Sequence, residues 1–295
     1  MLFTSASSTA RYLLPQKIKR LSLGKSRFHL LRVPIFTNKV HKLQASSIMN
    51  DHRILALSSS RVGNSGYLEF AAPEIKDFLG PKPINIAFIP FAAVTNDYEH
   101  YHAIVQEGLK QLGYNIQLVT PGEAKATLSQ ADAIMVGGGN TFKLLHDLYA
   151  LDLVDLVKTK VARGTPYVGW SAGANIAGAT ICTTNDMPII QPLSFTSLGF
   201  FSFQLNPHYI NQKVEGHNGE TRDERLTEFT QLNPGIPVVG LPEGSLLRME
   251  GENLYYKGMA PAVMFIGKNS QVSREEISPG TDLTHLQSQS MRLSV

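Results

Sequence analysis

A serine at position 171 has neighbours whose spacing suits nucleophilic catalysis. Residues 169–173 read GWSAG and fit the pattern G-x-S-x-G, directly after a short apolar run that predicts a buried strand. A serine on a sharp strand-to-helix turn projects its hydroxyl away from the backbone, and small neighbours let a carbonyl group approach it. The alternative interpretation is a Gly/Ala-rich turn that packs a helix tightly against a sheet.

A serine nucleophile needs a general base, and the base needs an acid that orients it. His208 follows a short predicted strand, and Pro207 stiffens the turn before it. Two acids are candidates: Glu243 lies in a Pro-Glu-Gly turn after an apolar strand, and Asp186 lies closer in sequence to the serine, in the segment TTNDMP. Either could equally be an ordinary turn carboxylate.

A run of three glycines, residues 137–139, follows the apolar segment 131–136. No Gly-Lys-Ser/Thr follows it, and its spacing differs from G-x-G-x-x-G, so neither a P-loop nor a dinucleotide-binding turn is predicted. We interpret the run as a source of backbone N–H groups that face an oxyanion, together with the N–H of Ala172. A plain tight turn is the alternative.

The elements that must position these residues alternate between strands and helices. Apolar runs predict strands at 53–57, 84–89, 116–119, 131–136 and 166–168, and helical spacing predicts helices at 67–79, 97–112, 124–130, 141–148, 153–162 and 219–232. This alternation predicts an α/β fold with a doubly wound, mostly parallel sheet. Antiparallel edge strands are expected at 246–249, 254–257 and 262–266. Ligands bind such sheets beyond the carboxyl ends of the strands, where the glycine run and Ser171 would both lie.

Length and composition favour one catalytic domain in the 295-residue chain. We expect a basic leader over residues 1–50, a single α/β domain over 51–268 and a polar, poorly ordered tail over 269–295. No apolar run approaches the ~20 residues that span a bilayer. The single cysteine, Cys182, excludes an internal disulfide, is typical of a reducing compartment and is expected to be a small buried residue.

Charge is distributed unevenly along the chain. Residues 1–50 hold nine of the 27 Lys and Arg residues and none of the 24 Asp and Glu residues, so residues 51–295 hold 18 basic and 24 acidic side chains, a net charge of −6. A mildly acidic domain argues against nucleic-acid binding. We therefore expect a cytoplasmic enzyme without nucleic-acid or membrane partners. The acid-free leader makes mitochondrial import the alternative, and translation from Met49 would omit that leader.

Six motifs occur in an order that resembles the peptidase E family of α-aspartyl dipeptidases. They are VGGGNTF at 136–142, GWSAGAN at 169–175, TTNDMP at 183–188, NPH at 206–208, GETR at 219–222 and GLPEG at 240–244. The resemblance covers roughly residues 53–265. It implies a flavodoxin-like fold related to class I glutamine amidotransferases, and a serine hydrolase that splits dipeptides with an N-terminal aspartate.

The resemblance also implies roles for individual residues. Ser171 becomes the nucleophile and His208 the base, while the orienting acid falls at Asp186 or Glu243. Gly139 and Ala172 become oxyanion donors, Arg222 the partner of the substrate aspartate, and Asn140 an assisting ligand; no metal or other cofactor is expected. The alternatives are a cyanophycinase-like hydrolase of β-aspartyl linkages and a catalytically silent binding protein on the same scaffold.

Overall fold

The computed structural model describes residues 51–212, 215–216, 218–268 and 271–288. All of them belong to one unit of the chain, Ser47–Val295. The expected basic leader, residues 1–50, lies outside the described residues. No helix in the described part is long and apolar enough to cross a membrane.

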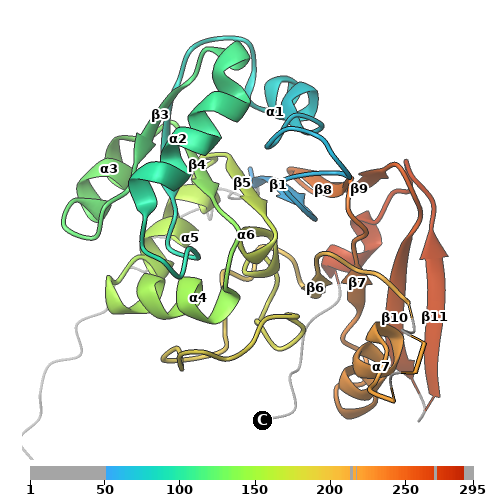
Figure 1. Ribbon diagram of the computed structural model, residues 1–295. Coiled ribbons are helices and arrows are strands. Elements are labelled where there is room, and N and C mark those ends of the chain that lie inside the picture. Colours follow the sequence, from blue (N-terminus) through green and yellow to red (C-terminus); the bar gives the residue numbers. More distant parts are fainter. Residues whose placement is uncertain (1–50, 213–214, 217, 269–270, 289–295) are drawn as a thin grey trace, which may run out of the picture. The chain divides into compact units, whose positions relative to one another are not determined.

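The main sheet has seven strands in the order β3-β2-β4-β5-β1-β8-β9 (Figure 1). Its parallel part comprises β1 (Arg53–Leu57), β2 (Asn85–Ile89), β3 (Asn115–Leu118), β4 (Ala133–Val136) and β5 (Tyr167–Trp170). The antiparallel edge comprises β8 (Ser245–Glu250) and β9 (Asn253–Gly258). The predicted doubly wound α/β fold, with antiparallel edge strands from the C-terminal part, is confirmed.

Helices cover both faces of this sheet because successive strand residues point to opposite sides. Ile54 and Ala56 of β1 join one core, and Leu55 and Leu57 join the other. The first core packs under α3 (Ala124–Gln130), α4 (Thr141–Ala150) and α5 (Val154–Ala162), and the second packs under α1 (Ala72–Leu79) and α2 (Tyr98–Leu109). The expected helix at 67–79 begins only at Ala72, because Leu68 has φ +55° and the residues before α1 form turns.

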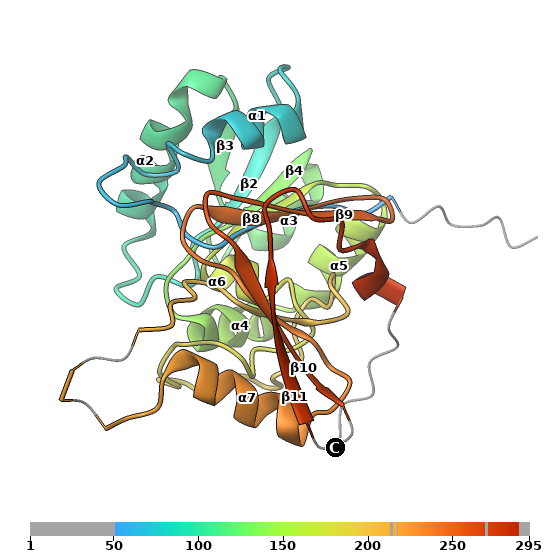
Figure 2. The ribbon, with the colours of Figure 1, turned by 90° about the vertical axis from the view of Figure 1, so that its right-hand side faces the viewer.

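A second sheet, in the order β11-β10-β7-β6, stands beside the first (Figure 2). It comprises β6 (Gln204–Asn206), β7 (Val238–Gly240), β10 (Ala262–Lys268) and β11 (Gln271–Ile277), with α7 (Arg222–Leu232) packed on β10. A Cβ at Gly267 of β10 would lie 2.3 Å from the carbonyl oxygen of Thr230 in α7, so this glycine permits the close packing. The expectation that 262–266 forms an edge of the main sheet is therefore wrong.

Residues 271–288 differ from the expected poorly ordered tail, and the rest of that tail, residues 269–270 and 289–295, lies outside the described residues. Residues 271–277 form β11, and Thr284–Ser288 form a short 3₁₀ helix, η2. Leu283 and Leu286 are buried in the first core. The polar sequence misled because most of β11 is exposed, which leaves no apolar alternation to detect. Cys182, expected to be buried, is exposed.

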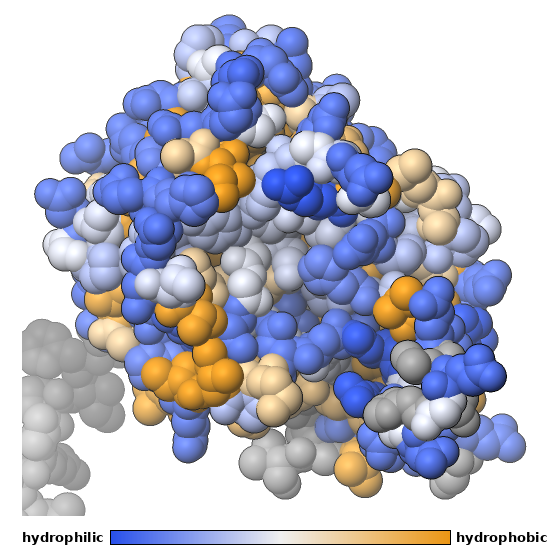
Figure 3. Space-filling model, in the orientation of Figure 1, coloured by the Kyte–Doolittle hydropathy of each residue, from blue (hydrophilic) through white to orange (hydrophobic). Residues whose placement is uncertain are grey.

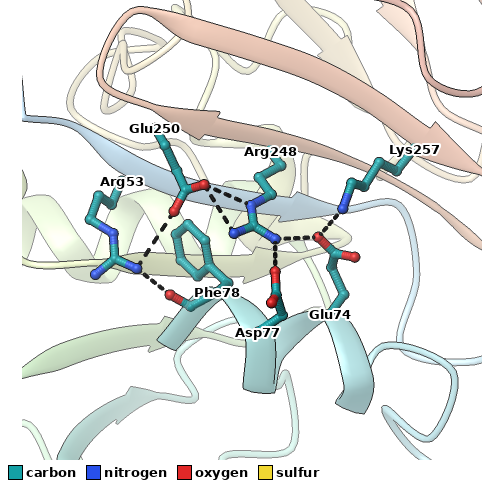
Figure 4. Close-up of polar contacts among 7 residues, drawn as sticks. All are labelled: Arg53, Glu74, Asp77, Phe78, Arg248, Glu250 and Lys257. Atoms are coloured by element: carbon teal, nitrogen blue, oxygen red, sulfur yellow. Dashed lines mark hydrogen bonds and ion pairs between the residues drawn. The ribbon is translucent and has the colours of Figure 1, made fainter. Parts of the chain in front are cut away.

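An ion cluster ties the antiparallel edge of the main sheet to α1 (Figure 4). Arg248 of β8 contacts Glu74 at 2.8 Å and Asp77 at 2.5 Å, both on α1, and Glu250 at 2.9 Å. Lys257 of β9 reaches Glu74 at 2.7 Å. Burial by itself lowers the pKa of Arg248, but the three carboxylates outweigh it and raise that pKa. The cluster holds the β8–β9 hairpin against α1.

Candidate active site

Ser171 lies on a strained turn at the centre of the main sheet. It follows β5, which pairs with β1 on one side and β4 on the other, and it precedes the short helix α6 (Ala172–Asn175). Its φ is +53° and its ψ −112°, a backbone conformation that is costly for a residue with a side chain. A Cβ at Gly173 would lie 2.2 Å from the carbonyl oxygen of Val136, so the turn needs small residues here. This is the geometry that G-x-S-x-G predicts.

The glycine run lies against Ser171 because β4 and β5 are parallel neighbours. A Cβ at Gly138 would lie 2.9 Å from Ser171 Cβ and 3.3 Å from Ser171 Oγ. Gly139 has φ +136°, and a Cβ there would lie 2.3 Å from the carbonyl oxygen of Ala92. Within the described part of the chain, the N–H groups of Gly138, Gly139 and Ala172 have no acceptor. These donors remain available to a ligand beside the serine.

His208 and Glu243 come from the second sheet. Strands β6 and β7 are parallel neighbours, so the residues that follow them lie together. His208 Nδ1 contacts Glu243 Oε1 at 2.8 Å, which leaves Nε2 as the ring atom open to a further partner. Glu243 rather than Asp186 therefore lies next to the histidine. The two side chains are 42% and 52% exposed, so this pair sits at the mouth of the site.

Ser58 joins the two sheets, and sequence reasoning missed it. It directly follows β1, is fully buried, accepts a hydrogen bond from the His208 N–H at 3.0 Å and donates to the Leu241 carbonyl at 2.7 Å. His208 has φ +53°, so this contact helps to hold an unfavourable backbone conformation. The sequence could have indicated Ser58, because a serine at the carboxyl end of a parallel strand next to β5 lies at the edge of the sheet where ligands bind.

Asp186 contacts Thr141, the first residue of α4. One of its carboxylate oxygens, Oδ2, accepts from the Thr141 N–H at 2.7 Å, from Thr141 Oγ1 at 2.5 Å and from Thr184 Oγ1 at 3.3 Å. Among the described residues no hydrogen bond links Asp186 to His208, and Oδ1 of Asp186 accepts none. The carboxylate is thus held through one oxygen and presents the other.

The loop that carries Asp186 is held by polar contacts rather than by side-chain burial. Met187, Ile189 and Leu193 are exposed, and Figure 3 shows hydrophobic side chains at the lower left, where this loop runs beneath α4. Asn140 donates from Nδ2 to the Met187 carbonyl at 2.9 Å, and its Oδ1 caps α4 by accepting from the Lys143 N–H at 3.0 Å. Asn140 thus uses Oδ1 and one Nδ2 hydrogen within the protein, and its expected role as an assisting ligand stays a prediction.

Arg222, the first residue of α7, is half-buried and has no ion-pair partner among the described residues. Its Nη1 lies 3.4 Å from Asn206 Oδ1, a weak contact. Burial and, second, the nearby charge of Arg225 lower the pKa of Arg222. The charge of Asp186 offsets part of this effect, but a partly desolvated guanidinium with no carboxylate in direct contact is costly, and an anionic ligand would relieve that cost.

A cavity of about 210 Å³ brings these side chains together. Its lining residues are Thr141, Ser171, Ala172, Asn175, Thr184, Asn185, Asp186, Pro207, His208 and Arg222. Among them Arg222 is the one permanent cation and Asp186 the one carboxylate. Gly139, Asn140 and Glu243 are not among the lining residues. The described residues contain no group of three or more His, Cys, Asp or Glu side chains that could hold a metal ion.

Comparison with known proteins reveals relatives over most of the described chain. The model of peptidase family S51 matches residues 54–256. Peptidase E of Shewanella oneidensis is 48% identical over 233 residues, which are 79% of this chain and 97% of that protein. The match to the family ends before β10, so the outer hairpin of the second sheet falls beyond it.

Solved structures show a similar fold at lower identity. A peptidase from an acI-B1 Actinobacterium has a TM-score of 0.57 and 19% identity, with 79% of this chain and 98% of that one covered. A protein from Listeria monocytogenes EGD-e has a TM-score of 0.56 and 22% identity, with 71% of this chain and 99% of that one covered. The arrangement of strands and helices is thus shared among chains whose sequences have diverged widely.

Proposed function

The chain belongs to peptidase family S51 and is a serine peptidase, and from that premise we propose that it hydrolyses dipeptides whose first residue is aspartate. The observation that carries this specificity is Arg222, a half-buried cation without an ion partner among the described residues, on the same cavity as Ser171. A guanidinium pairs with a carboxylate through two parallel hydrogen bonds, which suits recognition of the aspartate side chain.

Asp186 supports a second requirement, which is that the substrate has a free N-terminal ammonium group. Its unoccupied Oδ1 belongs to the one carboxylate that lines the cavity, opposite in charge to Arg222. An N-terminal aspartate carries a carboxylate and an ammonium group a few bonds apart. In our proposal Arg222 binds the first and Asp186 binds the second. The cavity is smaller than the roughly 300–1,000 Å³ of pockets that enclose drug-sized ligands, which favours a short substrate.

The proposed reaction begins when Ser171 Oγ attacks the carbonyl carbon of the N-terminal residue. His208 Nε2 takes the hydroxyl proton, while Glu243 holds the ring through Nδ1 and stabilises the imidazolium. The carbonyl oxygen becomes an oxyanion that accepts from the N–H groups of Gly139 and Ala172. The C–N bond then breaks, His208 returns the proton to the leaving amine, and water cleaves the acyl-enzyme by the same base.

A panel of dipeptides tests the proposal. Purified protein is assayed with Asp-Leu, Asn-Leu, Gly-Leu, N-acetyl-Asp-Leu and β-linked Asp-Leu, and kcat/KM is measured for each. We expect kcat/KM to be highest for Asp-Leu and to be much lower for N-acetyl-Asp-Leu. Preference for the β-linked peptide would instead assign a cyanophycinase-like activity. If none of the peptides is cleaved, the proposal is contradicted.

We also place the enzyme in the cytosol, because the single cysteine is typical of proteins in a reducing compartment. Fluorescent fusions started at Met1 and at Met49 test the location. Both fusions are expected in the cytosol. Mitochondrial signal from both would contradict the proposed location, and signal from the Met1 fusion alone would assign an import function to residues 1–50.

A further inference from the structure

A chain of hydrogen bonds runs beneath the catalytic turn, from Trp170 to the glycine run. Trp170 Nε1 lies 2.9 Å from Tyr67 Oη and 3.1 Å from Tyr101 Oη, and the two tyrosine hydroxyls are 2.9 Å apart. Tyr101 Oη lies 3.1 Å from the carbonyl oxygen of Gly138. Trp170 itself stacks on Phe88 with ring centroids 5.8 Å apart, so the first donor of this hydrogen-bond series is fixed in the core.

The number of hydrogens fixes the direction of this chain. The indole N–H can only donate, and a carbonyl oxygen can only accept. Each tyrosine hydroxyl has one hydrogen, so Tyr101 must use its own on the Gly138 carbonyl and must accept from Tyr67. Burial and, next, the proximity of Tyr67 raise the pKa of Tyr101 well above its ordinary value, so this donor stays protonated in the pH range of an assay.

The Gly138 carbonyl controls where the next N–H points. In a planar trans peptide the N–H of Gly139 is directed opposite to the carbonyl of Gly138. Tyr101 holds that carbonyl toward the buried aromatic cluster, so the Gly139 N–H is turned away from the cluster. It has no acceptor among the described residues.

The glycine run is shaped to receive this tyrosine. A Cβ at Gly137 would lie 2.5 Å from Tyr101 Oη and 2.8 Å from its Cζ, so a side chain at 137 would displace the hydroxyl. On its other side the same run contacts Ser171, since a Cβ at Gly138 would lie 2.9 Å from Ser171 Cβ. The loop is therefore held between the tyrosine hydroxyl and the nucleophile.

We propose that Tyr101, supported by Tyr67 and Trp170, is a positioning residue that aims the Gly139 N–H at the oxyanion formed on attack by Ser171. It touches neither the substrate nor the reacting atoms and acts through the Gly138–Gly139 peptide. The inference rests on the proposed role of Ser171 as nucleophile, but it does not depend on the preference for aspartate.

The test is Tyr101→Phe, which keeps the ring and removes the donor. Diisopropyl fluorophosphate is the probe, because its reaction with a serine passes through a charged phosphoryl oxygen and needs no aspartate side chain. We expect the rate constant for modification of Ser171 to fall about 10–100-fold, less than the ~10²–10³-fold loss on removal of an oxyanion donor itself. On Asp-Leu, kcat should fall in parallel while KM stays within about twofold.

Tyr114→Phe is the matched control. Tyr114 is a partly buried tyrosine whose hydroxyl donates to the Gly80 carbonyl at 2.6 Å, at the opposite end of the strands. Each variant loses one bond from a tyrosine to a carbonyl, which should lower Tm by about 2–4 °C, and Tyr101→Phe should lower it further because the acceptor of the Tyr67 hydroxyl is also lost. Only Tyr101→Phe should slow the labelling of Ser171.

Three results would overturn the inference. Labelling within twofold of the wild-type rate in Tyr101→Phe is the first, and an equal loss in Tyr114→Phe is the second. If Tyr101→Phe does not fold, Tyr67→Phe removes the donor that holds Tyr101 and should slow labelling about 2–10-fold; an unchanged rate there is the third. Wild-type protein that is labelled at Ser171 but does not cleave Asp-Leu would contradict only the proposed substrate.

Discussion

The two walls of the candidate site are held by different physical means. The first, formed by Ser171 and the glycine run, stands on the parallel sheet and is fixed by backbone: φ at Ser171 is +53°, and there is no room for a Cβ at Gly138 or Gly139. The second, formed by His208, Glu243 and Arg222, comes from the second sheet and α7. There the histidine is fixed by a polar contact of 2.8 Å between side chains that are 42% and 52% exposed.

This difference suggests how the tasks are divided. The first wall holds the nucleophile and the oxyanion donors, which must be placed within fractions of an ångström and are surrounded by close-packed atoms. The second wall holds groups whose charges orient and recognise, and exposed polar contacts give graded effects when altered. Changes in the first wall and in the His208–Glu243 pair should therefore slow the reaction of every substrate by the same factor, whereas changes at Arg222 should alter the preference between substrates.

The largest effect is expected from Ser171→Ala. Loss of the nucleophile in a well-studied serine protease lowers kcat by ~10⁶, and alanine removes only the hydroxyl from the turn. Activity on Asp-Leu should become undetectable, while the circular dichroism spectrum and Tm stay close to those of the wild type. More than a few per cent of residual activity in pure protein would show that Ser171 is not the nucleophile.

Glu243→Gln and Asp186→Asn separate the two acids. Glu243 contacts His208 and Asp186 does not, so Glu243→Gln should lower kcat by ~10³–10⁴, as loss of an orienting acid does elsewhere. Asp186→Asn should chiefly raise KM, because in our proposal Asp186 binds the substrate ammonium group. Steady-state kinetics on Asp-Leu measure both. A larger loss of kcat in Asp186→Asn than in Glu243→Gln would reverse the assignment.

Gly138→Ala tests how little space the first wall allows. The added methyl would lie 2.9 Å from Ser171 Cβ, closer than real Cβ atoms approach, so the loop must shift away from the nucleophile. We expect kcat to fall by ~10²–10³, the loss that follows from removing an oxyanion donor. Gly122→Ala is the control, since a Cβ there meets nothing within 4 Å. Equal activity of the two variants would contradict the close approach.

The smallest effect is expected from Arg274→Met, beyond the region matched by the family. Arg274 Nε contacts Asp223 Oδ2 at 2.9 Å, and Tyr209 donates to the same carboxylate, so both anchor the start of α7 beside Arg222. Loss of this partly exposed pair should raise KM for Asp-Leu about 2–5-fold. Lys125→Met is the control, because Lys125 of α3 forms an exposed ion pair with Asp152 at 3.3 Å and neither side chain lines the cavity. An unchanged KM in Arg274→Met would show that this ion pair does not help to position Arg222.

The sequence predicts the first wall far better than the second. Apolar runs are local signals, so β4, β5 and the turn at Ser171 follow from residues next to one another. The contact between His208 and Glu243 depends on the parallel pairing of β6 and β7, which are three residues each and separated by the whole of α7. Neither propensity nor periodicity reports such a pairing, and the choice between Asp186 and Glu243 stays open without it.

Asn140 and β11 illustrate two other limits. Asparagine is a favoured N-cap, and its position before α4 indicates a capping role that the sequence analysis did not include. β11 has mostly exposed side chains, so its polar sequence resembles a tail, and only its pairing with β10 makes it a strand. Both partners are close in sequence, since Asn140 caps the N–H of Lys143 and β11 pairs with the strand directly before it.

The recognition of aspartate by Arg222 is tested most directly by the ratio of kcat/KM for Asp-Leu to kcat/KM for Asn-Leu in four proteins: wild type, Glu243→Gln, Arg222→Met and Arg222→Lys. Glu243→Gln should lower both values by the same factor and keep the wild-type ratio. Arg222→Met should lower the value for Asp-Leu about 30- to several-thousand-fold, corresponding to ~2–5 kcal/mol, and bring the ratio toward one. Arg222→Lys should recover only part, because an ammonium group cannot make two parallel hydrogen bonds. A wild-type ratio in Arg222→Met would contradict the account and transfer the recognition of aspartate to another cation, with Arg225 the first to examine.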